Sequence, residues 1–121
     1  MEHEELTGRI IRSAIAVHKE LGPGFLESIY EAALVKALSD DGLIIEKQKE
    51  IPVFFRGFQV GTHRLDLLVE NTIVIELKAI KALEDIHFAQ VRSYLKATNL
   101  RHGLLFNFNE IPLKTKRVIC D

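Results

Sequence analysis

Two short apolar segments constrain the fold of this chain most, because they read as neighbouring strands. Arg64–Val69 and Ile73–Lys78 are rich in strand-forming residues, and a turn around Glu70-Asn71 can join them as an antiparallel hairpin. A loop of about three residues sets Asp66 nearly opposite Glu76, whereas a loop of two shifts the register by one residue. The length of this loop therefore decides which side chains share a face.

Acidic and basic residues in these segments are spaced as a metal site requires. Side chains alternate along a strand, so Glu76 and Lys78 point to one face, and Asp66 joins them in the three-residue register. Carboxylate oxygens suit Mg²⁺, the backbone carbonyl of Leu77 can add a neutral ligand, and a nearby ammonium can position an attacking water. The alternative is an ordinary hairpin with Ile73, Ile75 and Leu77 buried. Val74, Glu76 and Lys78 are then exposed to solvent, and Glu76 and Lys78 form a weak ion pair.

The remaining periodicity predicts an α/β protein with helices flanking a mixed sheet, in the order α-α-β-β-β-α-β. Apolar residues at helical spacing predict helices over about Glu4–Leu21, Leu26–Ser39 and Leu83–Thr98. Alternating or continuous apolar runs predict strands over about Ile44–Phe55, Gln59–Val69, Thr72–Ala79 and Gly103–Phe108, with a further candidate at Lys116–Ile119. Pro52 indicates an edge strand or a bulge.

Length and composition limit the class of protein. The chain of 121 residues, 47% apolar and 27% charged, is expected to form one globular domain over residues 1–121. No apolar run reaches the roughly 20 residues that cross a bilayer, and the acidic start lacks the features of a signal peptide. The one cysteine, Cys120, is consistent with a reducing cytoplasm and excludes an intramolecular disulfide.

Helical residues supply further candidates for a site. Glu27 follows Gly24 at a helix start, where it is either a favourable charge at the helix dipole or a third carboxylate that leans toward the sheet. Gln90 and Tyr94 lie one turn apart on a predicted inward stripe with Ile86, so the amide requires polar partners.

The net charge of −1 does not indicate a nucleic-acid binder, but the charge is unevenly distributed. Residues 78–121 carry eight bases and four acids, which is either a solvated surface or a modest basic surface for phosphates. Lys81, Arg92 and Lys96 are the bases in this third that we expect to contact nucleic acid.

Taken in order, these motifs resemble a known family. Gly24-Phe25-Leu26-Glu27-Ser28-Ile29-Tyr30 is similar to the signature of the GxxExxY proteins, and Asp66, Glu76-Leu77-Lys78 and Gln90-Val91-Arg92-Ser93-Tyr94 resemble the core of the PD-(D/E)xK nuclease superfamily. The resemblance spans about residues 10–118. One departure is that Leu65 stands where the superfamily has its proline.

The resemblance implies a restriction-endonuclease-like core and a Mg²⁺-dependent nuclease, with Mn²⁺ as a substitute metal. By analogy, Asp66, Glu76 and Glu27 hold the metal, Lys78 is the catalytic lysine, and Gln90 and Tyr94 match the Gln-x-x-x-Tyr helix of the RecB-like branch. The expected substrate is nucleic acid, DNA before RNA, with a homodimer or a protein partner supplying further recognition. The alternative is a catalytically silent adaptor of the same fold that binds nucleic acid or protein.

Overall fold

The computed structural model describes residues 3–120 and contains three helices and one five-stranded sheet. In chain order the elements are α1 (Glu4–Leu21), α2 (Glu27–Asp40), β1 (Ile45–Phe55), β2 (Phe58–Val69), β3 (Ile73–Lys78), α3 (Asp85–Thr98), β4 (His102–Asn107) and β5 (Lys114–Ile119). The predicted order is confirmed, and the candidate C-terminal strand is present. None of the helices in residues 3–120 is long and apolar enough to cross a membrane.

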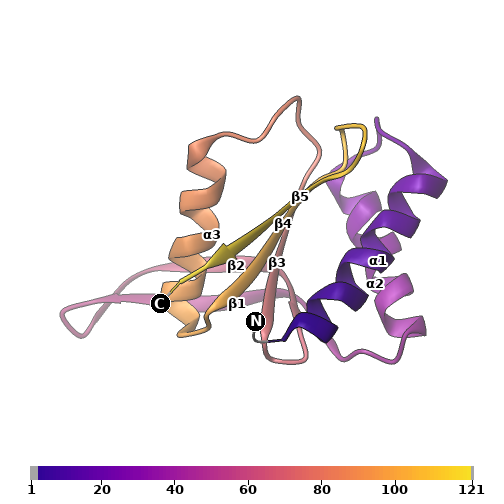
Figure 1. Ribbon diagram of the computed structural model, residues 1–121. Coiled ribbons are helices and arrows are strands. Elements are labelled where there is room, and N and C mark those ends of the chain that lie inside the picture. The colour runs from indigo at the N-terminus through magenta and orange to yellow at the C-terminus, as the bar shows by residue number, and fades with distance from the viewer. Residues whose placement is uncertain (1–2, 121) are drawn as a thin grey trace.

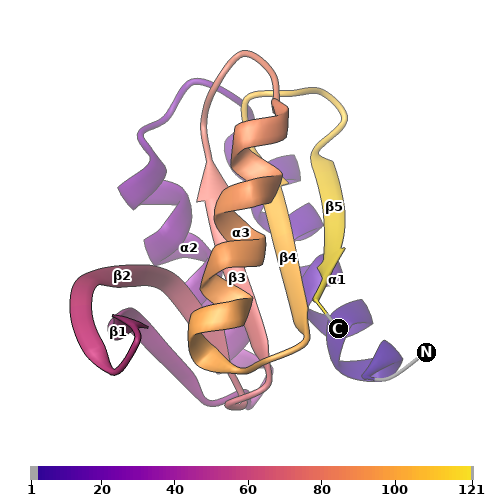
Figure 2. The same cartoon turned by 90° about the vertical axis from the view of Figure 1, so that its left-hand side faces the viewer.

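The sheet has the order β1-β2-β3-β4-β5 and is mixed. The β3–β4 pair is parallel because α3 crosses between these strands, and the other three pairs are antiparallel. Helices α1 and α2 cover one face of the sheet and α3 covers the other (Figure 1). Figure 2 shows α3 lying along β3 and β4, with the β1–β2 hairpin to one side. Pro52 lies on an edge strand, next to a register shift between Val53 and Phe54, as predicted.

Strand β3 lies at the centre of the sheet and is covered on both faces. Ile73, Ile75 and Leu77 pack in the core beneath α1 and α2, whereas Val74 packs in the smaller core beneath α3. Val74 is fully buried and Glu76 is 3% exposed. The alternative of a solvent-exposed hairpin face is therefore wrong, because α3 covers the face that would otherwise meet water.

Helix α3 approaches the sheet closely over Gly103 of β4. A Cβ atom at this position would lie 2.8 Å from Cγ1 of Val91, so a larger residue would push the helix away. Val91 and Leu95 are fully buried under the helix. This close packing brings Tyr94, on the same helix, down to the level of the polar residues of β3.

Candidate metal-binding active site

The site begins where strands β2 and β3 separate. Their pairing ends at Leu67 opposite Ile75, so the next residues, Asp66 and Glu76, face each other across a widening gap. The three residues between the strands give the register that sets these two acids opposite each other. Oδ2 of Asp66 accepts a hydrogen bond of 2.8 Å from the backbone N–H of Leu77, which has no partner in β2 at this point.

The carboxyl group of Glu76 is enclosed between the sheet and α3. Burial raises its pKa far above the ordinary value for glutamate, and its hydrogen bond to Asp66 and the charge of Asp66 raise it further. The charge of Lys78 and a hydrogen bond with Tyr94 oppose this rise without cancelling it. Without a cation, Glu76 therefore retains its proton at neutral pH, and a metal ion bound by this carboxylate would displace that proton.

Residues of helix α3 cover this cluster. Tyr94 is buried, and its pKa is raised by burial and then by the neighbouring charge and hydrogen bond of Glu76. Gln90, one turn earlier, hydrogen bonds with Tyr94 and favours its ionised form. The predicted inward stripe is wrong at Ile86, which is 69% exposed, because α3 has only begun at Asp85 and its first turn extends past the core.

Comparison with known proteins gives the family of the chain. The sequence matches the PD-(D/E)XK nuclease superfamily over residues 4–118. The chain belongs to the PD-(D/E)XK nuclease superfamily. No match was found among curated proteins.

One similar solved structure is the crystal structure of SSO0001, with a TM-score of 0.62 and 20% sequence identity. The match covers 97% of this chain and 59% of that protein, so the chain spans little more than half of its length. At this identity the likeness shows the fold alone, which is the restriction-endonuclease-like α/β arrangement that the sequence predicts.

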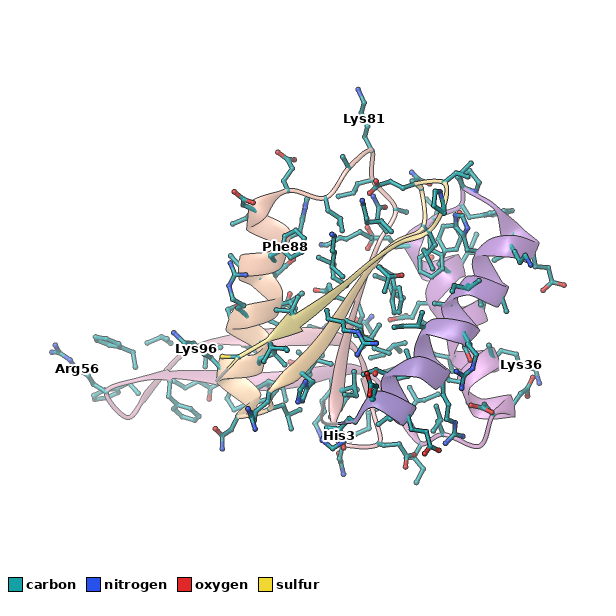
Figure 3. The ribbon with its side chains drawn as sticks, viewed as in Figure 1. His3, Lys36, Arg56, Lys81, Phe88 and Lys96 are labelled. Carbon is teal, nitrogen blue, oxygen red and sulfur yellow. The ribbon has the colours of Figure 1, made fainter. Side chains whose placement is uncertain are left out.

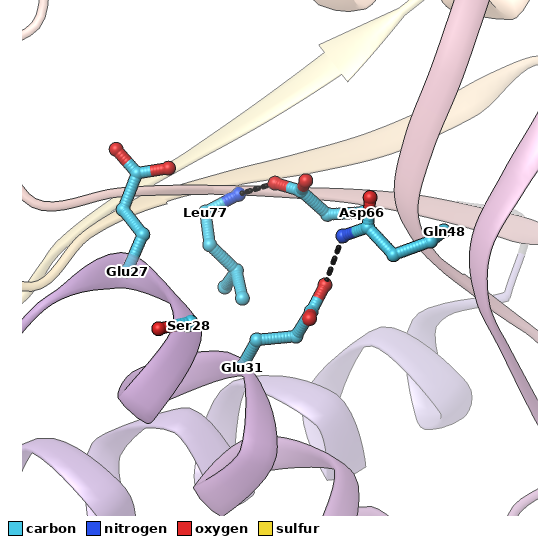
Figure 4. A pocket seen from close by; sticks show the side chains of 6 residues that line it. All are labelled: Glu27, Ser28, Glu31, Gln48, Asp66 and Leu77. Atoms are coloured by element: carbon cyan, nitrogen blue, oxygen red, sulfur yellow. Dashed lines mark hydrogen bonds between the residues drawn. The ribbon is translucent and has the colours of Figure 1, made fainter.

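Glu27, on α2, lies across a cavity from the two acids. It lines a cavity of about 190 Å³ together with Asp66 and Leu77, and Figure 4 shows Glu27 and Asp66 on opposite sides of Leu77. Within residues 3–120, no three His, Cys, Asp or Glu side chains are gathered closely enough to form a metal-binding group. The structure thus brings Asp66 and Glu76 together and leaves Glu27 across the cavity from them.

Three residues that line this cavity, Ser28, Glu31 and Gln48, were not predicted from the sequence. Gln48 of β1 adopts a positive φ of 49° and is skipped in the ladder, where Lys47 pairs with Leu67 and Lys49 with Leu65. Its Nε2 donates a hydrogen bond of 2.6 Å to Oε1 of Glu31 on α2, beside Asp66 (Figure 4). Such a backbone conformation is costly for a glutamine and is concentrated at functional sites, but nothing in the local sequence indicates it.

Asn107, beside Lys78 in the sheet, is a further residue that was not predicted, and here the sequence carries a signal. It is a fully buried polar residue at the end of the apolar run of β4, opposite Lys78. Its side-chain amide bonds to both backbone groups of Ile80, at 3.0 Å to the N–H and 2.9 Å to the carbonyl oxygen. Asn107 therefore fixes the backbone that follows Lys78.

Tyr30 anchors the loop that leads to Glu27. Its hydroxyl donates to the carbonyl oxygen of Gly22 and accepts a hydrogen bond of 3.2 Å from the N–H of Phe25. Its ring is fully buried and stacks on Phe108 with 4.5 Å between ring centroids. The tyrosine three residues after Glu27 thus holds the start of α2 in place without touching the carboxylate pair.

We expect Tyr30→Phe to destabilise the protein by about 1–3 kcal/mol, because it leaves the carbonyl of Gly22 and the N–H of Phe25 without their partner. Urea denaturation measures this change, and limited proteolysis should show faster cleavage between Gly22 and Leu26. Tyr94→Phe is the matched control, since it removes the other tyrosine hydroxyl without touching this loop. Equal proteolysis of the two variants would contradict the assigned role.

The three predicted nucleic-acid contacts lie outside the carboxylate cluster. Lys81, Arg92 and Lys96 are all exposed. In Figure 3, Lys81 extends from the loop after β3 and Lys96 lies at the opposite end of α3, toward the β1–β2 hairpin that carries Arg56. Their assignment to nucleic acid stays a prediction.

Proposed function

We propose that this chain is a metal-dependent nuclease of the GxxExxY branch, acting as one domain over residues 1–121 in the cytoplasm and hydrolysing phosphodiester bonds of DNA or RNA. The observation that supports this most is that Asp66, Glu76 and Tyr94 meet at the gap between β2 and β3. The charge of Lys78 also acts on the carboxyl group of Glu76 and lowers its pKa. Superfamily membership supports the nuclease-like character independently.

The donor set fits a hard divalent cation such as Mg²⁺ or Mn²⁺. Mg²⁺ commonly uses one or two carboxylates and completes its shell with waters and substrate phosphates, so Asp66 and Glu76 suffice. The carbonyl of Leu77 opens toward the same gap as its N–H, because both groups of a strand residue point to the same neighbour. Glu27 lines the adjoining cavity, where it can act through a water ligand. When bound, the metal polarises the phosphoryl group and lowers the pKa of a water.

The chain's own residues complete the reaction. Lys78 holds the attacking water in line with the phosphorus and stabilises the negative charge that develops on the phosphoryl oxygens. The new bond joins the oxygen of water to phosphorus, and the bond from phosphorus to the leaving oxygen breaks. The proton that the water loses passes to solvent, and solvent supplies one to the leaving oxygen. Tyr94, held by Gln90, fixes the orientation of Glu76 from the helix side.

Metal removal tests this proposal. The protein is incubated with plasmid DNA, single-stranded DNA and RNA in Mg²⁺, Mn²⁺ or EDTA, and we expect cleavage with metal and none in EDTA. Mg²⁺ should also raise the melting temperature saturably, since it binds the folded state only. Asp66→Asn should lose both responses, whereas Asp85→Asn, an exposed acid at the start of α3, should keep them.

Absence of cleavage on every substrate, with the same Mg²⁺ response in both variants, would refute the catalytic proposal. Binding of nucleic acid without cleavage would instead favour the adaptor.

A further inference from the structure

The β1–β2 hairpin extends beyond the rest of the sheet and carries exposed apolar side chains. Figure 1 shows the hairpin passing α3 and ending away from the body of the protein. Phe54 is 61% exposed and Phe58 is 77% exposed, and Phe55 and Val60 are exposed as well. Exposed apolar side chains that cluster in this way indicate an interaction surface for a ligand or a partner.

One face of the hairpin forms a hollow with the C-terminal half of α3. The hollow has a volume of about 460 Å³. Pro52, Val53 and Phe54 line it from the hairpin, and Ser93 and Lys96 line it from the helix. An aromatic ring beside a lysine and a hydroxyl suits a flat, partly polar group that is attached to a negative charge, which describes a nucleotide.

The charges around the hollow fit a phosphate. No acidic residue occurs between Ile51 and Leu65, whereas Arg56 and Arg64 lie in this segment. Among residues 3–120, Lys96 forms no ion pair, and Arg92, one turn before it on α3, is exposed. The hairpin also carries an acid, Glu50, whose Oε1 lies 3.7 Å from the guanidinium group of Arg64. The net charge at this end of the molecule is therefore positive.

Contacting side chains connect the lining of the hollow to the carboxylate cluster. His63, which lines the hollow, contacts Tyr94 edge-on with 4.5 Å between ring centroids, and Tyr94 contacts Glu76. Phe54 pairs with Gln59, seven residues from Asp66 along β2, which corresponds to about 23 Å of strand.

We propose that the hollow between the β1–β2 hairpin and α3 binds an unpaired nucleotide of the substrate, with the base stacked on Phe54 and the phosphate paired with Lys96. This inference rests on the proposed function, which gives nucleic acid as the substrate. It adds that the bases of that substrate are unpaired. A base that is paired in a duplex has its faces covered by its neighbours and cannot stack on Phe54.

A second copy of this chain is the competing occupant of the surface. Pairing of two copies along the free edge of β1 is hindered by Pro52 and by the bulge between Val53 and Phe54, which interrupt the row of backbone donors. The positive charge around the hollow repels an identical copy and attracts a polyanion. The observations therefore favour nucleic acid.

The test is a binding assay in EDTA, so that it does not depend on cleavage. A fluorescein-labelled oligothymidylate of about 20 nucleotides is titrated with the protein and followed by anisotropy. We expect Phe54→Ala and Lys96→Ala each to weaken binding about 5- to 30-fold. Phe58→Ala is the matched control, since Phe58 pairs with Phe55 and points to the other face, and it should change affinity by less than about two-fold.

Several results would overturn the inference. They are no measurable binding by the wild type, equal effects of the Phe54 and Phe58 variants, an equal effect of Phe54→Ala on a fully paired duplex, or conversion of a dimer to a monomer by Phe54→Ala in light scattering. The outcome is separable from that of the cleavage assay: a protein that cleaves nothing but loses oligonucleotide binding with Phe54→Ala keeps this inference and loses the catalytic proposal.

Discussion

Replacing Lys78 by alanine is expected to lower the rate of phosphodiester cleavage by about 10²–10³-fold, because the charge that positions water and stabilises the developing negative charge is removed. Lys78 lies at the end of β3, two residues after Glu76 and opposite Asn107, so its backbone is held by pairing with β4 and by the hydrogen bonds of Asn107 to Ile80. The variant should therefore fold normally and still respond to Mg²⁺.

Lys81→Ala is the matched control for this experiment. Lys81 is an exposed lysine on the loop that follows β3, and Figure 3 shows its side chain extending away from the body of the protein. Its removal should cost at most a few-fold in cleavage, through weaker attraction of phosphates. If the two variants lose activity equally, Lys78 contributes only a positive charge that attracts phosphates, and the catalytic assignment is wrong.

Glu76→Gln is expected to stabilise the metal-free protein above pH 5 and to abolish its response to Mg²⁺. In the unfolded chain Glu76 ionises near its ordinary pKa of 4.5, whereas burial raises that pKa in the folded protein. The folded state thus binds more protons, and the stability that Glu76 contributes falls as pH rises from about 4.5 toward the folded pKa. The loss approaches about 1.4 kcal/mol per pH unit. Glutamine does not ionise, so the variant should be more stable at pH 8 by about 2 kcal/mol or more.

Urea denaturation of both proteins at pH 5, 6.5 and 8 in EDTA measures this difference. Only the difference between variant and wild type isolates Glu76, because the other acids titrate in both. Glu50→Gln, which removes an exposed acid from the hairpin, should leave the pH dependence of the wild type unchanged. A difference that does not grow with pH would show that Glu76 is ionised in the folded protein without metal. The same linkage predicts that Mg²⁺ binds the wild type more tightly as pH rises.

The order of the elements could be predicted from the sequence because it follows from local periodicity. The helix Glu4–Leu21 has the bounds that its apolar spacing predicts, and the second and third helices begin or end within two residues of the predictions. The sequence left open whether the loop between the strands has two or three residues, and only a loop of three sets Asp66 opposite Glu76. The structure has three residues there, so this register is confirmed.

Other features depended on contacts between distant parts of the chain. Whether Glu76 faced water or a second core was decided by α3, which Gly103 allows to pack closely on β4. The positive φ of Gln48 and its bond to Glu31 join β1 to α2, and no local pattern encodes either.

The sequence by itself determined the helices, the strands and the residue types available for metal chemistry, because these depend on neighbours within a few positions. The tertiary structure alone decided the environment of those residues: the raised pKa of Glu76, the cavity that Glu27 lines and the hollow beside Phe54. The physical reason is that pKa values and cavities depend on how much water is excluded, and here that exclusion comes from elements far apart in the chain.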